Sequence, residues 1–181
     1  MPTDLFDNGY ALLIGAGGDL PATVRDARAV YDILVDAERA GYPTEQVTLL
    51  TEAEAGKAAV EQSLDRLIDR LAADRRPNAT VLLYFSGHGG YDEADPARPF
   101  YLLTNGYDPG DLAGTSLSGD TFSAKLDRIG QHAKKLIVLL DSCHAGAVKT
   151  KDGATLIEEA PVKGAGRQRL RADMEQLVHA L

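Results

Sequence analysis

The chain has 181 residues, a length that builds one domain with a substantial core. Hydrophobic residues make up 44% and charged residues 25%, which is typical of a folded globular protein rather than a disordered one. The net charge of −8 argues against a general nucleic-acid binder, because phosphate contacts require concentrated Lys and Arg.

Short apolar runs alternate with helical stripes through the first 148 residues. In chain order they predict a strand at 10–15, a helix that begins near Pro21 and ends before Gly41, a strand at 46–50, a helix over 60–71, strands at 79–85 and 99–103, a helix over 122–129 and a strand at 135–140. Strands that alternate with helices indicate right-handed β-α-β units. We therefore expect an α/β fold with a mostly parallel sheet flanked by helices.

The last 33 residues differ from the rest. Residues 149–169 have the glycine and proline content of a flexible loop, and residues 170–181 resume a helical stripe. A crossover helix after a parallel strand normally leads into another strand, and none follows here. We therefore expect a missing C-terminal portion, although a helix packed at the sheet edge is the alternative.

Two polar stretches directly follow predicted strands. Ser86-Gly87-His88 comes after the strand at 79–85, and Asp141-Ser142-Cys143 comes after the strand at 135–140. In an open parallel sheet, catalytic groups gather beyond the carboxyl ends of the strands. We therefore expect His88 and Cys143 to leave the same sheet edge from adjacent strands.

A histidine beside a cysteine suits nucleophilic catalysis. A free thiol, with a pKa of about 8.5, is only slightly ionised at neutral pH, and an imidazole can take its proton and later protonate a leaving amine. Backbone N–H groups, for instance those of Gly89 and Cys143, could stabilise the oxyanion of an acyl-transfer intermediate. A metal site from His88, Cys143 and Asp141 is chemically possible, but it would occupy the nucleophile and lacks a second cysteine.

Four short segments carry a family resemblance. They are residues 84–89 (YFSGHG), 139–146 (LLDSCHAG), 12–15 (LLIG) and 24–27 (VRDA). With them, the sequence resembles the large-subunit region of caspase-like cysteine peptidases, specifically metacaspases and their bacterial relatives. The resemblance implies a three-layer caspase-like sandwich over residues 1–148, without the small-subunit strands. It also implies a cysteine endopeptidase with Cys143 as nucleophile and His88 as acid/base.

The resemblance further implies cleavage after Arg or Lys. The positions that match the acidic primary specificity pocket, S1, are Asp26, Ser86 and Asp141. Two carboxylates in a partly desolvated pocket favour a cationic side chain, and Arg can bind them bidentately. An aspartate-specific caspase would need cationic groups there instead.

Partners follow from the same resemblance. Enzymes of this type often cut the segment between their large and small subunits, and candidate cut sites lie at Lys149, Lys151, Lys163, Arg167, Arg169 and Arg171. A small-subunit portion or C-terminal domain is the expected protein partner, and a peptide or protein is the expected substrate. The alternative is a caspase-fold regulatory or interaction module that is inactive without such a portion.

Calcium is a possible ligand because many metacaspases bind it through acids after the catalytic histidine. Acids are present here at Asp92, Glu93, Asp95, Asp108 and Asp111. Their spacing does not reproduce a dense acidic pattern, so we expect a solvated loop, no metal and no cofactor. The segment Gly15-Ala16-Gly17-Gly18-Asp19-Leu20 resembles a dinucleotide fingerprint without its third glycine, and a tight strand-to-helix turn is the better account.

The cellular setting follows from the absence of several features in the sequence. Cys143 is the single cysteine, so a disulfide within the chain is excluded. No apolar run approaches the roughly 20 residues that cross a bilayer, and residues 1–5 lack the basic group of a secretory signal. We expect a cytoplasmic protein with neither a membrane nor a nucleic-acid partner.

Overall fold

The computed structural model describes residues 6–92, 95–97, 99–142 and 154–158. In this part of the chain, parallel strands form the main sheet in the order β2–β1–β3–β6–β7. Their bounds are Gly9–Ala16 for β1, Val47–Thr51 for β2, Thr80–Tyr91 for β3, Lys135–Asp141 for β6 and Ala154–Glu158 for β7. The predicted parallel sheet is confirmed.

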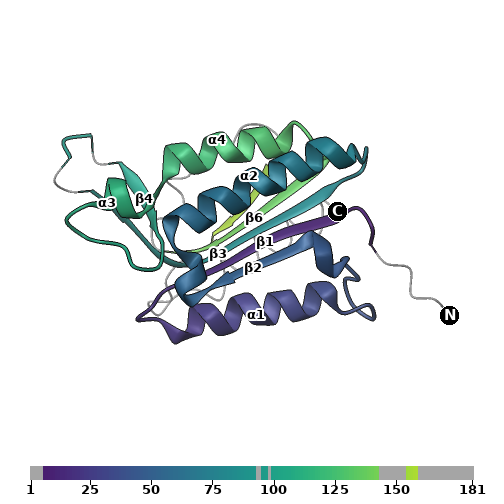
Figure 1. The fold of residues 1–181 in the computed structure, drawn as a ribbon, viewed down its shortest axis with the longest axis horizontal. Coiled ribbons are helices and arrows are strands. Elements are labelled where there is room, and N and C mark those ends of the chain that lie inside the picture. Colours follow the sequence, from purple (N-terminus) through teal and green to yellow (C-terminus); the bar gives the residue numbers. More distant parts are fainter. Residues whose placement is uncertain (1–5, 93–94, 98, 143–153, 159–181) are drawn as a thin grey trace, which may run out of the picture.

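Helices cover both faces of the sheet (Figure 1). Helix α1, Pro21–Val35, lies on one face, and helices α2, Lys57–Asp74, and α4, Gly119–Gly130, lie on the other. The shorter helices are α3, Leu112–Thr115, and two 3-10 turns, Thr44–Gln46 and Glu52–Ala55. The three-layer arrangement predicted from the sequence is confirmed, and none of the described helices is long and apolar enough to cross a membrane.

Strand β1 shows why the first apolar run is unbroken: every residue from Gly9 to Ala16 is buried. Leu12 and Ile14 belong to the core beneath α2 and α4, whereas Ala11 and Leu13 belong to the core beneath α1. Successive strand side chains point to opposite faces, so a strand covered on both faces must be apolar at every position. Each fully buried leucine stabilises the fold by about 1.5–3 kcal/mol relative to an exposed one.

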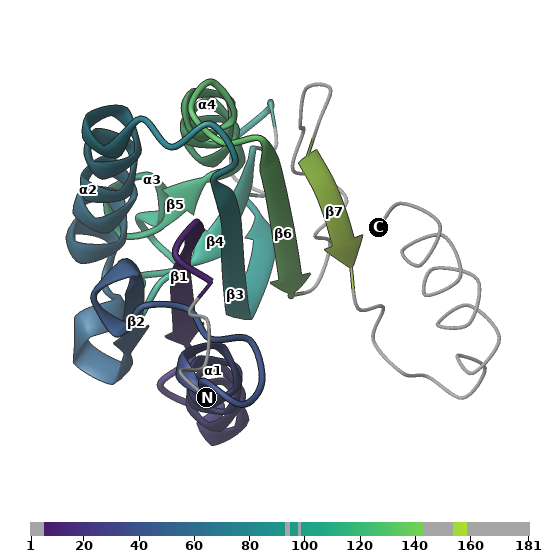
Figure 2. The same ribbon diagram turned by 90° about the vertical axis from the view of Figure 1, so that its right-hand side faces the viewer.

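Strand β3 extends beyond the predicted end at residue 85. Its last four residues, 88–91, pair antiparallel with β4, Phe100–Leu103, which pairs in turn with β5, Leu117–Ser118 (Figure 2). The prediction that His88 follows the strand is therefore wrong, because His88 lies within it, in register with Leu103. Strand β4 supplies backbone hydrogen-bond partners beyond the point where the apolar run of β3 ends.

A strand also occurs where the sequence predicted only a loop. Strand β7 pairs parallel with β6, from Leu136 opposite Ala154 to Leu140 opposite Glu158 (Figure 2). The loop predicted over 149–169 is thus wrong for residues 154–158. That stretch contains Thr155, Leu156 and Ile157, which favour a strand, but neighbouring glycine and proline dominated the prediction. The helix predicted over 170–181 lies outside the described residues.

Gly87 provides a test of how closely the strands approach. It is in register with Ala16, and a Cβ at position 87 would stand 2.2 Å from the backbone oxygen of Ala16. We expect Gly87→Ala to lower the free energy of unfolding by about 1–3 kcal/mol, because β1 and β3 must separate to admit the methyl group. Urea unfolding measures the loss. Gly90→Ala in the same strand is the control, since nothing lies within 4 Å of its added Cβ; equal midpoints for both variants would contradict the tight approach.

Candidate active site

The carboxyl ends of three parallel strands meet at one edge of the sheet. Ser86 of β3 is in register with Gly15 of β1 on one side and with Asp141 of β6 on the other. The predicted adjacency of the two strands that carry the polar stretches is therefore confirmed. His88 follows Ser86 by two residues at the same edge.

Alternation along the strands assigns these residues to one face. Leu82 and Tyr84 of β3, like Leu139 of β6, belong to the core beneath α1. Since strand side chains alternate with a period of two, Ser86 and Asp141 continue the same face. The polar residues at the strand ends therefore lie on the side of the sheet that α1 covers.

Ser86 and Asp141 form a direct contact. The Ser86 hydroxyl donates a hydrogen bond of 3.0 Å to a carboxylate oxygen of Asp141. Ser86 is almost fully buried, whereas Asp141 is partly exposed. Two of the three residues predicted for the specificity pocket are thus brought together, with a carboxylate oriented by a buried hydroxyl.

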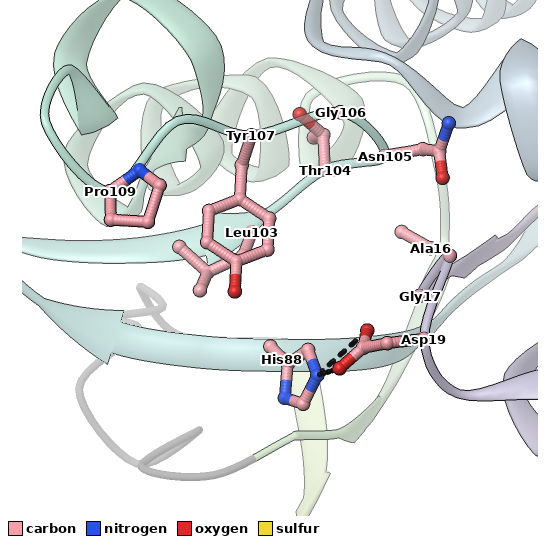
Figure 3. Close-up of a pocket in the computed structure, with 11 residues that line it drawn as sticks. Ala16, Gly17, Asp19, His88, Leu103, Thr104, Asn105, Gly106, Tyr107 and Pro109 are labelled. Atoms are coloured by element: carbon pink, nitrogen blue, oxygen red, sulfur yellow. Dashed lines mark hydrogen bonds and ion pairs between the residues drawn. The ribbon is translucent and has the colours of Figure 1, made fainter.

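His88 has a partner that was not predicted from the sequence. Its Nε2 lies 3.1 Å and 3.0 Å from the two carboxylate oxygens of Asp19 (Figure 3). Asp19 stands in the turn between β1 and α1, in which the Leu20 N–H donates to the Gly17 carbonyl at 2.9 Å. The tight strand-to-helix turn predicted there is confirmed, and it carries a carboxylate to the imidazole.

The contact changes the acidity of Asp19. The hydrogen bond from His88 holds the pKa of the Asp19 carboxyl below its ordinary value of 3.8, and a bond to the backbone N–H of Asp19 adds to the effect. Both interactions favour the ionised form. Asp19 is therefore ionised at neutral pH.

A pocket of about 400 Å³ opens beside this pair (Figure 3). Residues 16–19 line one side, His88 lines the floor, and residues 103–107 with Pro109 line the other side. The Tyr107 ring meets the imidazole edge-on, with ring centroids 6.5 Å apart. Backbone hydrogen bonds hold the side formed by residues 103–107. For example, the Asn105 N–H donates to the Ala55 carbonyl at 2.9 Å.

Asp26, the third predicted pocket residue, lies on α1 and is exposed. The buried face of that helix turn is formed by Thr23 and Ala27, which pack over Gly15. Within the described residues, the Asp26 side chain has neither a hydrogen-bond nor an ion-pair partner. The structure therefore assigns Asp26 to the correct helix but does not join it to Ser86 and Asp141.

Several predicted residues lie outside the described part of the chain. They are the nucleophile Cys143, which is also a predicted oxyanion donor, and the candidate cut sites Lys149, Lys151, Lys163, Arg167, Arg169 and Arg171. Glu93 of the acidic loop is among them too. The other predicted oxyanion donor, Gly89, lies in β3 in register with Leu102.

The acids after His88 mostly stabilise turns. Carboxylates of Asp95, Asp108 and Asp111 each accept a 2.8 Å hydrogen bond from a backbone N–H two or three residues later. Burial raises the pKa of Tyr101, and the charges of Asp92, Asp95 and Asp111 raise it further. Across the ranges that the structure describes, no three His, Cys, Asp or Glu side chains are grouped so that they could hold a metal ion.

Asp19 could have been found from its place in the sequence. It follows the first strand, and the same rule that selected residues after the other two strands applies to every carboxyl strand end. The glycines at 17 and 18 instead resemble part of a nucleotide-binding motif. Only the register of β1 against β3 shows that this turn faces His88.

Titration of Asp19 tests the contact. We expect His88→Ala to raise the pKa of the Asp19 carboxyl toward its ordinary value, because the bond from Nε2 is lost whereas the backbone bond remains. Carboxyl carbon shifts in NMR, followed between pH 2 and 6, measure the change. Asp65, whose pKa is lowered mainly by its hydrogen bond from Lys125, is the internal control and should not move. An unchanged Asp19 titration in the variant would contradict the contact.

Comparison with known proteins identifies the family. The model of the Caspase domain matches residues 8–176. Over 147 residues the chain is 26% identical to Metacaspase-1 of Kluyveromyces lactis, which covers 76% of this chain and 33% of that protein. Over 176 residues it is 27% identical to Metacaspase-1 of Lodderomyces elongisporus, covering 89% and 38% respectively.

A third relative agrees: Metacaspase-1 of Candida albicans is 28% identical over 143 residues, which is 75% of this chain and 31% of that protein. The chain spans about a third of the length of the curated relatives that it matches. The matched family model extends over all of the described strands, from Gly9 in β1 to Glu158 in β7. The chain therefore belongs to the caspase domain family.

Proposed function

We propose that this chain is a cysteine endopeptidase that cleaves after Arg or Lys with a Cys143–His88 dyad. The observation that carries the proposal is the strand register, in which Ser86 and Asp141 pair at the carboxyl ends of β3 and β6. His88 and Cys143 each follow one of these paired residues by two positions. Membership of the caspase domain family supports the same assignment.

Chain connectivity limits how far the nucleophile can be from the base. Two residues of backbone reach at most about 7 Å, so position 143 is tethered within that distance of Asp141. Neighbouring strands lie about 4.8 Å apart. The chain length therefore permits a thiol at position 143 to reach an imidazole at position 88, which supports the proposed dyad.

The proposed reaction has two steps. The Cys143 thiolate attacks the carbonyl carbon of the scissile bond, the C–N bond breaks, and the His88 imidazolium gives its proton to the leaving amine. Water then attacks the thioester while His88 takes its proton, which releases the acid and restores the thiol. Backbone N–H groups of Gly89 and Cys143 are the proposed donors to the oxyanion of each tetrahedral intermediate.

The carboxylates of Asp141 and Asp26 support basic specificity. Asp141 offers a carboxylate oriented by the buried Ser86 hydroxyl, on the face covered by α1. Asp26 on α1 is the proposed second carboxylate, and its exposed side chain has no competing ion-pair partner among the described residues. A guanidinium or ammonium group at the substrate residue before the scissile bond would be held by these charges.

The proposal extends to partners and setting. A small-subunit portion is proposed to complete the groove, and the lysines and arginines at 149–171 are proposed cut sites for maturation. The chemistry uses a thiol and an imidazole, so no metal or organic cofactor is proposed. An unpaired nucleophilic cysteine suits a reducing compartment, which supports a cytoplasmic location.

Cleavage assays with matched reporters test the activity. We expect peptides that end in Arg or Lys to be cleaved and peptides that end in Asp to be left intact. Cys143→Ala and His88→Ala should each abolish cleavage, because they remove the nucleophile and the acid/base. Wild-type Cys143 should also react with iodoacetamide below pH 7, where an ordinary thiol does not. Equal background from wild type and Cys143→Ala, with ordinary alkylation, would instead favour the regulatory module.

A second set of variants tests the specificity pocket. We expect Asp141→Asn to lower kcat/KM for an Arg reporter about 10- to 100-fold, because a charge-assisted hydrogen bond contributes about 1.5–3 kcal/mol. Ser86→Ala should lower it less, since the carboxylate remains. Asp120→Asn, an exposed acid at the start of α4, is the charge-matched control. The iodoacetamide rate should stay unchanged in all three, and a parallel fall in that rate would mean damage to the nucleophile instead.

A further inference from the structure

We propose that Asp19 is a positioning residue for His88, the acid/base of the proposed peptidase. This inference rests on the proposed function for its kinetic part. Its geometric part rests only on the contact between Nε2 of His88 and the carboxylate of Asp19. The role assigned to Asp19 is to fix which ring nitrogen exchanges protons with the thiol.

The contact determines the tautomer of the imidazole. An ionised carboxylate can only accept hydrogen bonds, and both of its oxygens lie within 3.1 Å of Nε2. The proton of the neutral ring must therefore sit on Nε2. Nδ1 is left with the free lone pair, so Nδ1 is the ring atom that is able to accept a proton.

The turn that holds Asp19 is built to keep the carboxylate in place. Besides the bond from the Leu20 N–H to Gly17, the Thr23 hydroxyl and N–H both donate to the Leu20 carbonyl. Gly17 and Gly18 allow close packing: an added Cβ at Gly18 would lie 3.1 Å from the Asn105 side-chain oxygen. The Asp19 carboxylate therefore contacts the imidazole from a turn that is held by hydrogen bonds.

The groups around the imidazole of His88 also favour Asp19 as the residue that positions it. Asp19 faces the ring from the turn after β1, and Tyr107 faces it edge-on from the segment after β4. Asp141 of β6 accepts a hydrogen bond from Ser86, which lies two residues before His88 in β3. Asp19 is thus the carboxylate in direct contact with the ring among the described residues, and it stabilises the imidazolium that forms when the thiol ionises.

If Asp19 had a purely structural role, its substitution would change the stability of the fold rather than turnover. The Asp19 side chain is 66% exposed and that of His88 is 33% exposed, so as an ion pair the contact contributes little to stability. A buried aspartate in this role contributes about 10⁴-fold to turnover in serine peptidases. We expect a smaller effect from an exposed carboxylate, about 10- to 100-fold.

The kinetic test compares Asp19→Asn, Asp19→Glu and Asp32→Asn. We expect Asp19→Asn to lower kcat for an Arg reporter about 10- to 100-fold with little change in KM, because the amide can donate to Nε2 and stabilise the wrong tautomer. It should also move the pH midpoint of Cys143 alkylation by iodoacetamide upward. Asp19→Glu keeps a carboxylate and should restore most of kcat. Asp32→Asn, an exposed acid on α1, makes the same charge change and should match wild type.

A measurement on the ring itself separates this inference from the proposed activity. Nitrogen chemical shifts of His88 at a pH where the ring is neutral should report the Nε2–H tautomer in wild type and a loss of that preference in Asp19→Asn. Suppose that the wild type does not cleave, but that its nitrogen shifts report the Nε2–H tautomer and Asp19→Asn loses that preference. The peptidase proposal then fails, whereas the positioning contact is supported. If wild type cleaves and Asp19→Asn matches it in kcat, alkylation midpoint and ring shifts, the role of Asp19 is overturned.

Discussion

The parallel pairing of β1, β3 and β6 in one register is the constraint on which the site depends. It sets Gly15, Ser86 and Asp141 side by side near the carboxyl ends of the three parallel runs. The pairing leaves no space for a side chain at Gly87, where a methyl group would meet the backbone of β1. Because β1 and residues 81–87 of β3 are buried on both faces, a slip of one residue between them would turn apolar side chains into the wrong core.

Two different polar environments lie at this edge of the sheet, one around Asp141 and one around Asp19. On the β6 side of β3, a buried serine orients the carboxylate of Asp141, which suits the recognition of a cation. On the β1 side, the carboxylate of Asp19 meets the imidazole of His88 beside a pocket of about 400 Å³. The two carboxylates face different partners, a hydroxyl and an imidazole. We therefore propose different tasks for them: Asp141 attracts the substrate cation, and Asp19 orients the ring of His88.

The antiparallel extension of β3 also matters for the chemistry. By pairing with β4, residues 88–91 keep the geometry of a strand instead of entering a loop. His88 is therefore carried on a hydrogen-bonded element, and the segment that follows β4 returns Tyr107 to the edge of its ring. A side chain on a strand is held more closely than one on a free loop, which suits the acid/base role that we propose for His88.

Local sequence signals determined much of this protein. Unbroken apolar runs identified β1, β3 and β6 because strands covered on both faces must be apolar throughout, and stripes at helical spacing identified α1, α2 and α4. The positions of His88 and Asp141 at one sheet edge followed from the same alternation. Only the tertiary structure decided the extension of β3, the strand at 154–158, and the contact between Asp19 and His88. Each of these depends on a partner in another element. The two strand segments need backbone partners in β4 and β6, and the Asp19 carboxylate is 69 residues from His88. Such partners leave no periodic signal in the sequence around them.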